Sequence, residues 1–123
     1  MGLKVNYYIR KNIIFIRIYG ELDQDTIGQV KGKIIEIIDK YNIKNVVFNL
    51  NEVEFMDSTG IGMIIGRYNQ IKKKGGKIIL CSLNKQIQKI VMLSGLSRIC
   101  EIKNSEEESL LYLEGIYEKW VKM

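Results

Sequence analysis

The chain has 123 residues, of which 46% are hydrophobic and 27% charged, with a net charge of +5, no histidine and no proline. This length and composition predict one globular domain over residues 1–123 with a buried core. The absence of histidine excludes Ser-His-Asp and Cys-His catalytic arrangements and makes a zinc site very unfavourable. We therefore expect no metal and no cofactor.

The positive charge does not indicate a nucleic-acid-binding protein. The only basic run, Lys72-Lys-Lys74, falls at the end of a predicted helix, where it complements the helix dipole. No aromatic residues alternate with basic ones as in stacking platforms, so we expect no direct binding to nucleic acid. No apolar run reaches the roughly 20 residues of a membrane span, and no secretory signal is present, which predicts a cytoplasmic protein without membrane contact. Cys81 and Cys100 lie in or beside apolar runs and are interpreted as buried free thiols.

The first third of the chain predicts two strands and a helix. Residues 3–10 alternate loosely between apolar and polar side chains, and residues 13–19 form a more apolar run, so a connection of two residues makes the two strands antiparallel neighbours. A helix follows, capped by Asp23 or Asp25. Its apolar face is expected to be Ile27, Val30, Ile34, Ile37, Ile38 and Tyr41. Gly28 and Gly32 lie on one side of it and indicate either close packing or a tolerated weakness.

The remaining chain alternates strands and helices. Strands are expected at residues 46–50, 77–81 and 99–102, the first of them apolar enough to be buried on both faces. Helices are expected from Ser58 to Gly75-Gly76, from a cap at Ser82 or Asn84 to Ser94-Gly95, and from a capping box at Ser105 onwards. Their apolar faces are Ile61, Ile64, Ile65, Tyr68 and Ile71; Ile87, Ile90 and Val91; and Leu110, Leu113, Tyr117 and Trp120 or Val121.

The order β-β-α-β-α-β-α-β-α predicts an α/β fold. Strands separated by helices require right-handed crossovers, so the five-stranded sheet is expected to be mostly parallel, with an antiparallel first strand at an edge and four helices. In such sheets the functional crevice lies at the carboxyl ends of the strands. If the second and third strands are neighbours, the loops that hold Asp23 and Asp57-Ser58-Thr59 lie on one rim.

Ser58 lies where the third strand gives way to a helix. Ser58 and Thr59 are good N-cap residues, because a side-chain oxygen can accept a bond from a free N–H of the first turn. The free N–H groups and the helix dipole also favour an anion at this point. A serine there can therefore carry a covalent phosphate at little structural cost, although most such pairs are only caps.

The segment Phe55-Met-Asp-Ser-Thr-Gly-Ile-Gly-Met-Ile-Ile-Gly-Arg-Tyr68 resembles the phosphorylation-site segment of anti-sigma factor antagonists, which are STAS domains. The resemblance extends to Gly20-Glu-Leu-Asp23, Gly75-Gly76 and Met92-Leu-Ser-Gly-Leu96, and it covers essentially the whole chain. It is greatest to the sporulation branch of that family. The resemblance implies a STAS fold and a regulator of transcription without enzymatic activity.

The resemblance also implies roles for particular residues. Ser58 matches the serine that an anti-sigma factor with serine kinase activity phosphorylates; the unphosphorylated form binds that partner and frees the sigma factor, and a serine phosphatase resets the switch. Asp23 matches an acidic residue at the partner surface. The motif around the acceptor supplies further partner-binding residues, namely Asp57, Thr59, Gly60 and Gly62, and Arg67 at the end of the same segment is expected to be another. We expect a monomer when the protein is free.

Several residues keep a structural alternative. Asp23 is alternatively a cap of the first helix, and Thr59 is either structural or a minor acceptor. Gly62 and Gly66 indicate helix–sheet or partner packing, because no Gly-Lys-Ser/Thr of a phosphate-binding loop follows them. Arg67 is interpreted as a solvated charge or a rim contact.

Two other functions remain open at this point. The chain could be a STAS interaction module of a stress-response or sensory pathway. It could also be a small nucleotide-handling enzyme that uses the Ser58 helix end as an anion site, but it has no Walker motif and no cluster of acid–base residues.

Overall fold

The computed structural model describes the backbone of residues 2–122 and the side chains of residues 2–115. The elements are β1 Leu3–Arg10, β2 Ile13–Leu22, the 3-10 turn η1 Ile27–Gln29, α1 Lys31–Lys40, β3 Asn45–Met56, α2 Ser58–Lys72, β4 Ile78–Cys81, α3 Lys85–Ser94, α4 Leu96–Ile99, β5 Glu101–Lys103 and α5 Glu106–Lys122. The predicted α/β order is confirmed. The short η1 and α4 are additions that the sequence pattern did not indicate.

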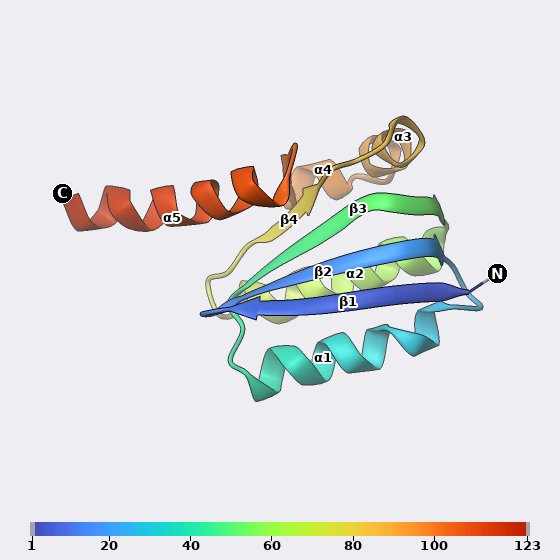
Figure 1. The fold of residues 1–123 in the computed structure, drawn as a ribbon, viewed down its shortest axis with the longest axis horizontal. Coiled ribbons are helices and arrows are strands. Elements are labelled where there is room, and N and C mark those ends of the chain that lie inside the picture. The colour runs from blue at the N-terminus through green and yellow to red at the C-terminus, as the bar shows by residue number, and fades with distance from the viewer. Residues whose placement is uncertain (1, 123) are drawn as a thin grey trace.

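The five strands form one sheet in the order β1-β2-β3-β4-β5. β1 pairs with β2 antiparallel, and every other neighbouring pair is parallel. The antiparallel edge strand and the adjacency of the second and third strands are therefore confirmed. The carboxyl ends of β2 and β3 point to the same end of the molecule, on the right of Figure 1.

Each face of the sheet packs against a different set of helices. Ile14, Ile16 and Phe48 face the larger core, which includes apolar side chains from α1, α2 and α3. The residues that alternate with them form a second cluster with α5: Ile13, Phe15, Val47, Ile79 and Cys81. Figure 1 shows α1 and α5 on opposite sides of the sheet. Residues 46–48 of β3 are thus buried on both faces, as the apolar run indicates, whereas the strand continues to Met56 with several exposed residues.

The first helix departs from its prediction. The chain makes the 3-10 turn before α1 begins at Lys31, so the segment from Asp23 is not one continuous helix. Ile34 and Ile38 are buried as expected, whereas Tyr41 follows the end of the helix and is 52% exposed. A Cβ atom at Gly28 or Gly32 would have no described atom within 4 Å. Neither glycine is therefore needed for close packing against the described residues, and Gly32, within α1, lowers the helix propensity.

The later elements agree more closely with the sequence. Asn84 caps α3 by accepting a hydrogen bond from the N–H of Ile87 at 2.9 Å, and Gly95 ends the helix in the left-handed conformation at φ 86°. The predicted start of the fifth strand is wrong by two residues, because β5 begins at Glu101 and Ile99 and Cys100 precede it. Both cysteines are free and buried. In the described part of the chain, no helix is both long and apolar enough to cross a membrane.

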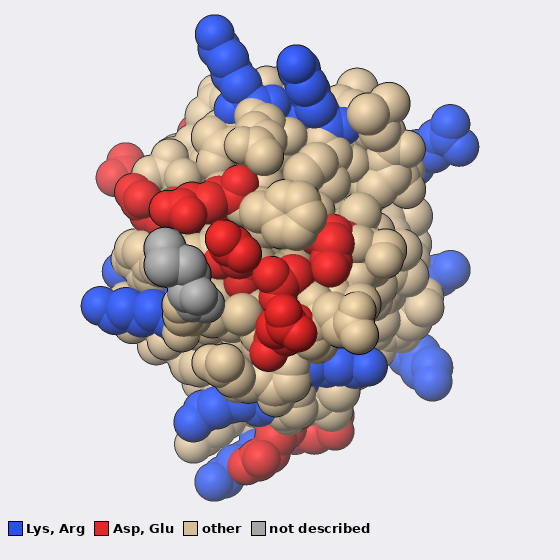
Figure 2. Space-filling model, turned by 90° about the vertical axis from the view of Figure 1, so that its right-hand side faces the viewer, with Lys and Arg blue, Asp and Glu red and all other residues tan. Residues whose placement is uncertain are grey.

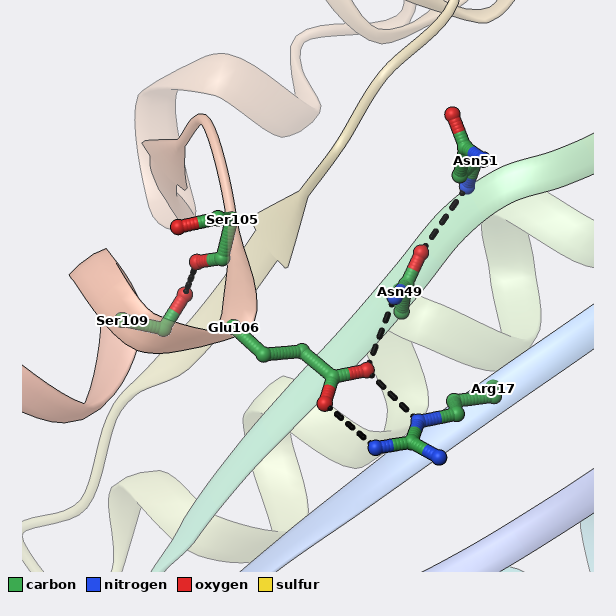
Figure 3. A network of polar contacts seen from close by, with 6 residues as sticks. All are labelled: Arg17, Asn49, Asn51, Ser105, Glu106 and Ser109. Carbon is green, nitrogen blue, oxygen red and sulfur yellow. Dashed lines mark hydrogen bonds and ion pairs between the residues drawn. The ribbon is translucent and has the colours of Figure 1, made fainter.

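A polar network attaches α5 to the sheet (Figure 3). The guanidinium of Arg17 on β2 donates two hydrogen bonds of 2.8 Å to the carboxylate of Glu106, and Asn49 Nδ2 donates a third of 2.7 Å. These hydrogen bonds lower the pKa of Glu106, and the bonds from Arg17 make the largest contribution. At the start of the helix, Ser105 Oγ accepts a hydrogen bond from the N–H of Glu108 at 3.0 Å, which confirms the predicted cap.

The inward face of α5 is confirmed where its side chains are described. Leu110 and Leu113 pack against the second cluster. The predicted inward side chains of Tyr117, Trp120 and Val121 lie outside the described residues.

Candidate functional site

The loops after β2 and β3 meet at one rim of the sheet. Leu22 and Met56 are partners in the parallel ladder, and each strand ends there. Beyond them, the N–H of Asp57 donates to the carbonyl of Leu22 at 3.3 Å, and the N–H of Gln24 donates to Oδ2 of Asp57 at 3.3 Å. Asp23 and Asp57 are therefore on adjacent segments, as the topology predicts.

Asp57, not Ser58 or Thr59, is the N-cap of α2. Its Oδ1 accepts hydrogen bonds from the N–H groups of Thr59 at 2.9 Å and Gly60 at 3.3 Å, and from the Thr59 hydroxyl. The expectation that Ser58 or Thr59 caps the helix is thus wrong. All three residue types can cap, so composition alone cannot choose among consecutive positions. The hydroxyl of Thr59 and these N–H groups lower the pKa of Asp57, which keeps its carboxylate charged.

This cap leaves the Ser58 hydroxyl available. Ser58 is the first residue of α2 and is exposed, while the carboxylate of Asp57 accepts the hydrogen bonds from the N–H groups of the first turn. Thr59, in contrast, is partly buried and bonded to the cap. The geometry therefore presents one serine hydroxyl to solvent at the positive end of a helix of 15 residues.

Asp23 organises its own loop. Its Oδ1 accepts hydrogen bonds from the N–H groups of Asp25 at 2.9 Å and Thr26 at 3.1 Å. This arrangement is an Asx turn ahead of the 3-10 turn. The residues before η1 and α1 are Thr26 and Val30, and neither makes a side-chain capping bond, so the prediction that Asp23 or Asp25 caps the first helix is wrong. The side chain of Asp23 is half-buried and still reaches the surface of the rim.

The glycines of α2 have different environments. A Cβ on Gly60 would lie 2.6 Å from the carbonyl oxygen of Leu22 and 2.7 Å from Cγ of Met56. At Gly62 and Gly66 a Cβ would meet nothing within 4 Å. Close helix–sheet packing thus depends on Gly60. The prediction that Gly62 and Gly66 allow such packing is wrong. Gly62 instead lies on the exposed side of the helix with Ser58.

Arg67 is neither solvated nor at the rim. Its side chain is only 6% exposed, because it lies on the buried stripe of α2 with Met63, Ile64 and Ile71. Nε donates to Oε1 of Gln70 at 2.9 Å, whereas Nη1 is buried without a hydrogen-bond partner among the described residues. The expectation of a solvated charge is therefore wrong, and the partner contact expected of Arg67 stays a prediction that its burial does not support. Desolvation lowers its pKa.

Sequence reasoning placed Asp23 and Asp57 on this rim but missed the other acidic side chains and the aromatic ring around it. We define the acidic rim as Glu21, Asp23, Asp25, Glu54 and Asp57, at the ends of β2 and β3 and in the loop after β2. Figure 2, which views the molecule from the right-hand side of Figure 1, shows acidic side chains gathered on this end. Phe55 is exposed beside them. The position of these residues at two adjacent strand ends was the available signal. No group of acidic or sulfur side chains in the described chain could hold a metal ion.

The fold and rim are those of a STAS domain. The STAS domain model matches residues 4–109, so the chain belongs to this family. The chain is 33% identical to the anti-sigma F factor antagonist of Paenibacillus polymyxa, over 94% of this chain and 99% of the relative. It is 34% identical to the anti-sigma-B factor antagonist of Listeria monocytogenes, over 77% of this chain and 82% of the relative. The chain is accordingly an anti-sigma factor antagonist, a class of regulatory proteins without enzymatic activity.

Solved structures of related chains have the same fold. The phosphorylated form of the Bacillus cell fate determinant SpoIIAA matches with a TM-score of 0.71 and 26% identity, over 91% of this chain and 99% of that chain. Unphosphorylated SpoIIAA matches with a TM-score of 0.74 and 23% identity, over 93% of this chain and 99% of that chain. A SpoIIAA-like relative is therefore known in both phosphorylation states.

Proposed function

We propose that this protein is a cytoplasmic anti-anti-sigma factor switched by phosphorylation of Ser58. The unphosphorylated form binds an anti-sigma factor that is also a serine kinase, and a sigma factor is released. The kinase then phosphorylates Ser58 and the complex dissociates; a serine phosphatase restores the binding form. The observation that carries the proposal is the exposed Ser58 hydroxyl at the start of α2, left free by the cap on Asp57.

The electrostatics of the rim support a switch that needs no refolding. A phosphate adds a charge of about −1.5 to −2 and three acceptor oxygens to Ser58. Within the domain, the positive end of α2 offsets part of this charge, although the carboxylate of Asp57 opposes it. In a complex formed around a neutral hydroxyl, the phosphate would have to be desolvated. That penalty amounts to several kcal/mol, so a loss of affinity of about 100-fold or more is expected.

We place the protein in sporulation rather than in a stress response. The match to the anti-sigma F factor antagonist extends over 94% of the chain, whereas that to the Listeria anti-sigma-B factor antagonist extends over 77% at similar identity. The 33% identity over nearly the whole chain favours an anti-sigma F factor as the partner. A stress-response partner is the second candidate, because the identities to the two groups are nearly equal.

The test is to mix the protein with the anti-sigma F factor of the same organism and Mg-ATP and to compare intact masses. Wild type should gain one phosphate, Ser58→Ala none, and Thr59→Ala one. Ser58→Ala should still bind the partner, which shows that the hydroxyl is the acceptor and not a folding requirement. Phosphate on both wild type and Ser58→Ala would locate the acceptor elsewhere. If the kinase is shown to be active and to bind the protein, the absence of phosphate on all three variants would contradict the switch.

A separate experiment tests which anti-sigma factor is the partner. Binding of the protein to the anti-sigma F factor and to the corresponding anti-sigma-B factor can be compared by isothermal titration calorimetry. We expect tight binding to the first only. Preference for the second would move the protein to the stress-response branch while leaving the Ser58 switch in place.

A further inference from the structure

Phe55 is an exposed aromatic side chain at the functional rim. It is 42% exposed on β3, between the exposed Glu54 and the buried Met56. It precedes Ser58 by three residues, so the two Cα atoms lie within about 11 Å of each other. A large aromatic ring in water forgoes the burial that usually stabilises such residues, and rings of this kind are enriched among the anchors of protein interfaces.

The register of the sheet determines the direction in which Phe55 projects. Phe55 is the ladder partner of Glu21, and the next pair is Leu22 with Met56. Leu22 and Met56 are buried in the core beneath α1 and α2. Because successive side chains of a strand alternate between faces, Phe55 and Glu21 lie together on the other face. The ring is therefore on the side of the sheet away from α1 and α2, at the edge where β2 and β3 end.

The surroundings of Phe55 are acidic in a protein that is basic overall. Five carboxylates form the acidic rim, whereas the whole chain carries a net charge of +5. The ion pair found within the described chain, Arg17 with Glu106, does not involve any of them. The negative charge of the rim is thus not neutralised by described basic side chains, and it is concentrated on the end shown in Figure 2. An apolar centre with a charged border is the usual layout of a protein-binding patch.

We propose that Phe55 is the apolar anchor of this rim, and that Glu21, Asp25 and Glu54 select a partner surface consisting of a nonpolar pocket edged by Lys and Arg. The proposal rests on the proposed function, and the occupant is the anti-sigma factor. Complementary charge speeds the encounter, and burial of the ring slows dissociation. A phosphate on Ser58 would place a strongly hydrated group close to the anchor. The pocket could not then close over the ring without desolvating that group.

The first experiment measures association and dissociation rates of the anti-sigma factor by surface plasmon resonance. Phe55→Ala should weaken binding about 10- to 100-fold, mainly through faster dissociation. Phe55→Leu should recover part of the loss, and Phe55→Gln should not. The matched control is Leu93→Ala, which removes an 89% exposed apolar side chain from α3 and should leave binding within twofold. Circular dichroism melts confirm that each variant is folded.

A second set of variants tests the carboxylates. Glu21→Gln, Asp25→Asn and Glu54→Gln together should slow association about tenfold at low salt and weaken its salt dependence. The same charge change at the exposed Glu36, Glu107 and Glu114 is the control. Equal affinities for wild type and Phe55→Ala, or equal losses in the test and control sets, would overturn the inference. Wild type that neither binds nor is phosphorylated would instead contradict the proposed function itself.

Discussion

The N–H of Gln24 donates a hydrogen bond to Oδ2 of Asp57 at 3.3 Å and so joins the loop after β2 to the first turn of α2. The other carboxylate oxygen of Asp57 accepts hydrogen bonds from the N–H groups of Thr59 and Gly60. One side chain therefore caps the helix and positions the neighbouring loop. Ser58 lies between these bonds with its hydroxyl exposed, so the proposed acceptor is held by its neighbours and not by its own side chain.

Removal of this cap should destabilise the domain. Asp57→Ala is expected to lower the free energy of unfolding by about 0.5–2 kcal/mol, because it leaves two N–H groups of the first turn without their acceptor. Ser58→Ala, the adjacent exposed position, should change it by less than about 0.5 kcal/mol. Urea denaturation of both variants measures the difference. A larger loss from Ser58→Ala than from Asp57→Ala would show that the serine is the cap.

Two glycines of α2 should respond oppositely to the same substitution. Gly60→Ala forces a methyl group against the carbonyl of Leu22 and should cost about 1–3 kcal/mol, since backbone cannot easily move away. Gly62→Ala has open space and should stabilise the helix by about 0.5–1 kcal/mol. Thermal unfolding distinguishes them, with the melting temperature falling for the first variant and rising for the second. A fall for both would indicate that the outer side of α2 is also packed.

The sheet is predictable because its signals are long and redundant. Short apolar runs such as residues 46–50 indicate buried strands, and helices between strands require parallel crossovers. The amino-acid sequence alone is therefore enough to place Asp23 and Asp57 on one rim. The rotation of α2 is less predictable. Apolar residues occur all around this helix, so the spacing that includes Ile61 and Ile65 competes with the one that includes Met63 and Arg67.

The second spacing is the correct one for a steric reason. Gly60 allows the helix to approach Leu22 and Met56, and this contact turns Met63, Ile64, Arg67 and Ile71 inward. A single sequence does not show which glycine touches a neighbour. The burial of Arg67 and the exposure of Phe55 are therefore consequences of tertiary packing, and local periodicity could not determine either one.

The ion pair that holds α5 should make stability depend on pH. The pKa of Glu106 is lower in the folded state than in the unfolded chain, chiefly because of its hydrogen bonds with Arg17. Its contribution is therefore present above the unfolded pKa and is lost as the pH falls through the folded pKa. Glu106→Gln should cost about 0.5–1 kcal/mol at pH 7, a modest figure because the side chain of Arg17 is 45% exposed.

That cost should shrink as the solution is acidified below about pH 4, because the wild-type carboxyl is then protonated as well. Urea denaturation at a series of pH values measures it. Glu107→Gln, the adjacent exposed glutamate, is the control and should show no such pH-dependent difference. A constant cost for Glu106→Gln at all pH values would mean that the carboxylate charge does not stabilise the contact.

Arg67 is predicted to be a destabilising residue at the interface between α2 and α1. Its Nη1 is buried without a hydrogen-bond partner among the described residues, while Gln70, which accepts the bond from Nε, also donates to the carbonyl of Ile35 at 3.3 Å. Replacement by methionine keeps the packing volume and removes the desolvated charge. Arg67→Met should therefore raise the free energy of unfolding by about 1 kcal/mol, measured in urea. Lys89→Met on the exposed side of α3 should change it by less than about 0.5 kcal/mol. A loss of more than about 1 kcal/mol from Arg67→Met would contradict this reasoning, because it would require a stabilising partner for the guanidinium.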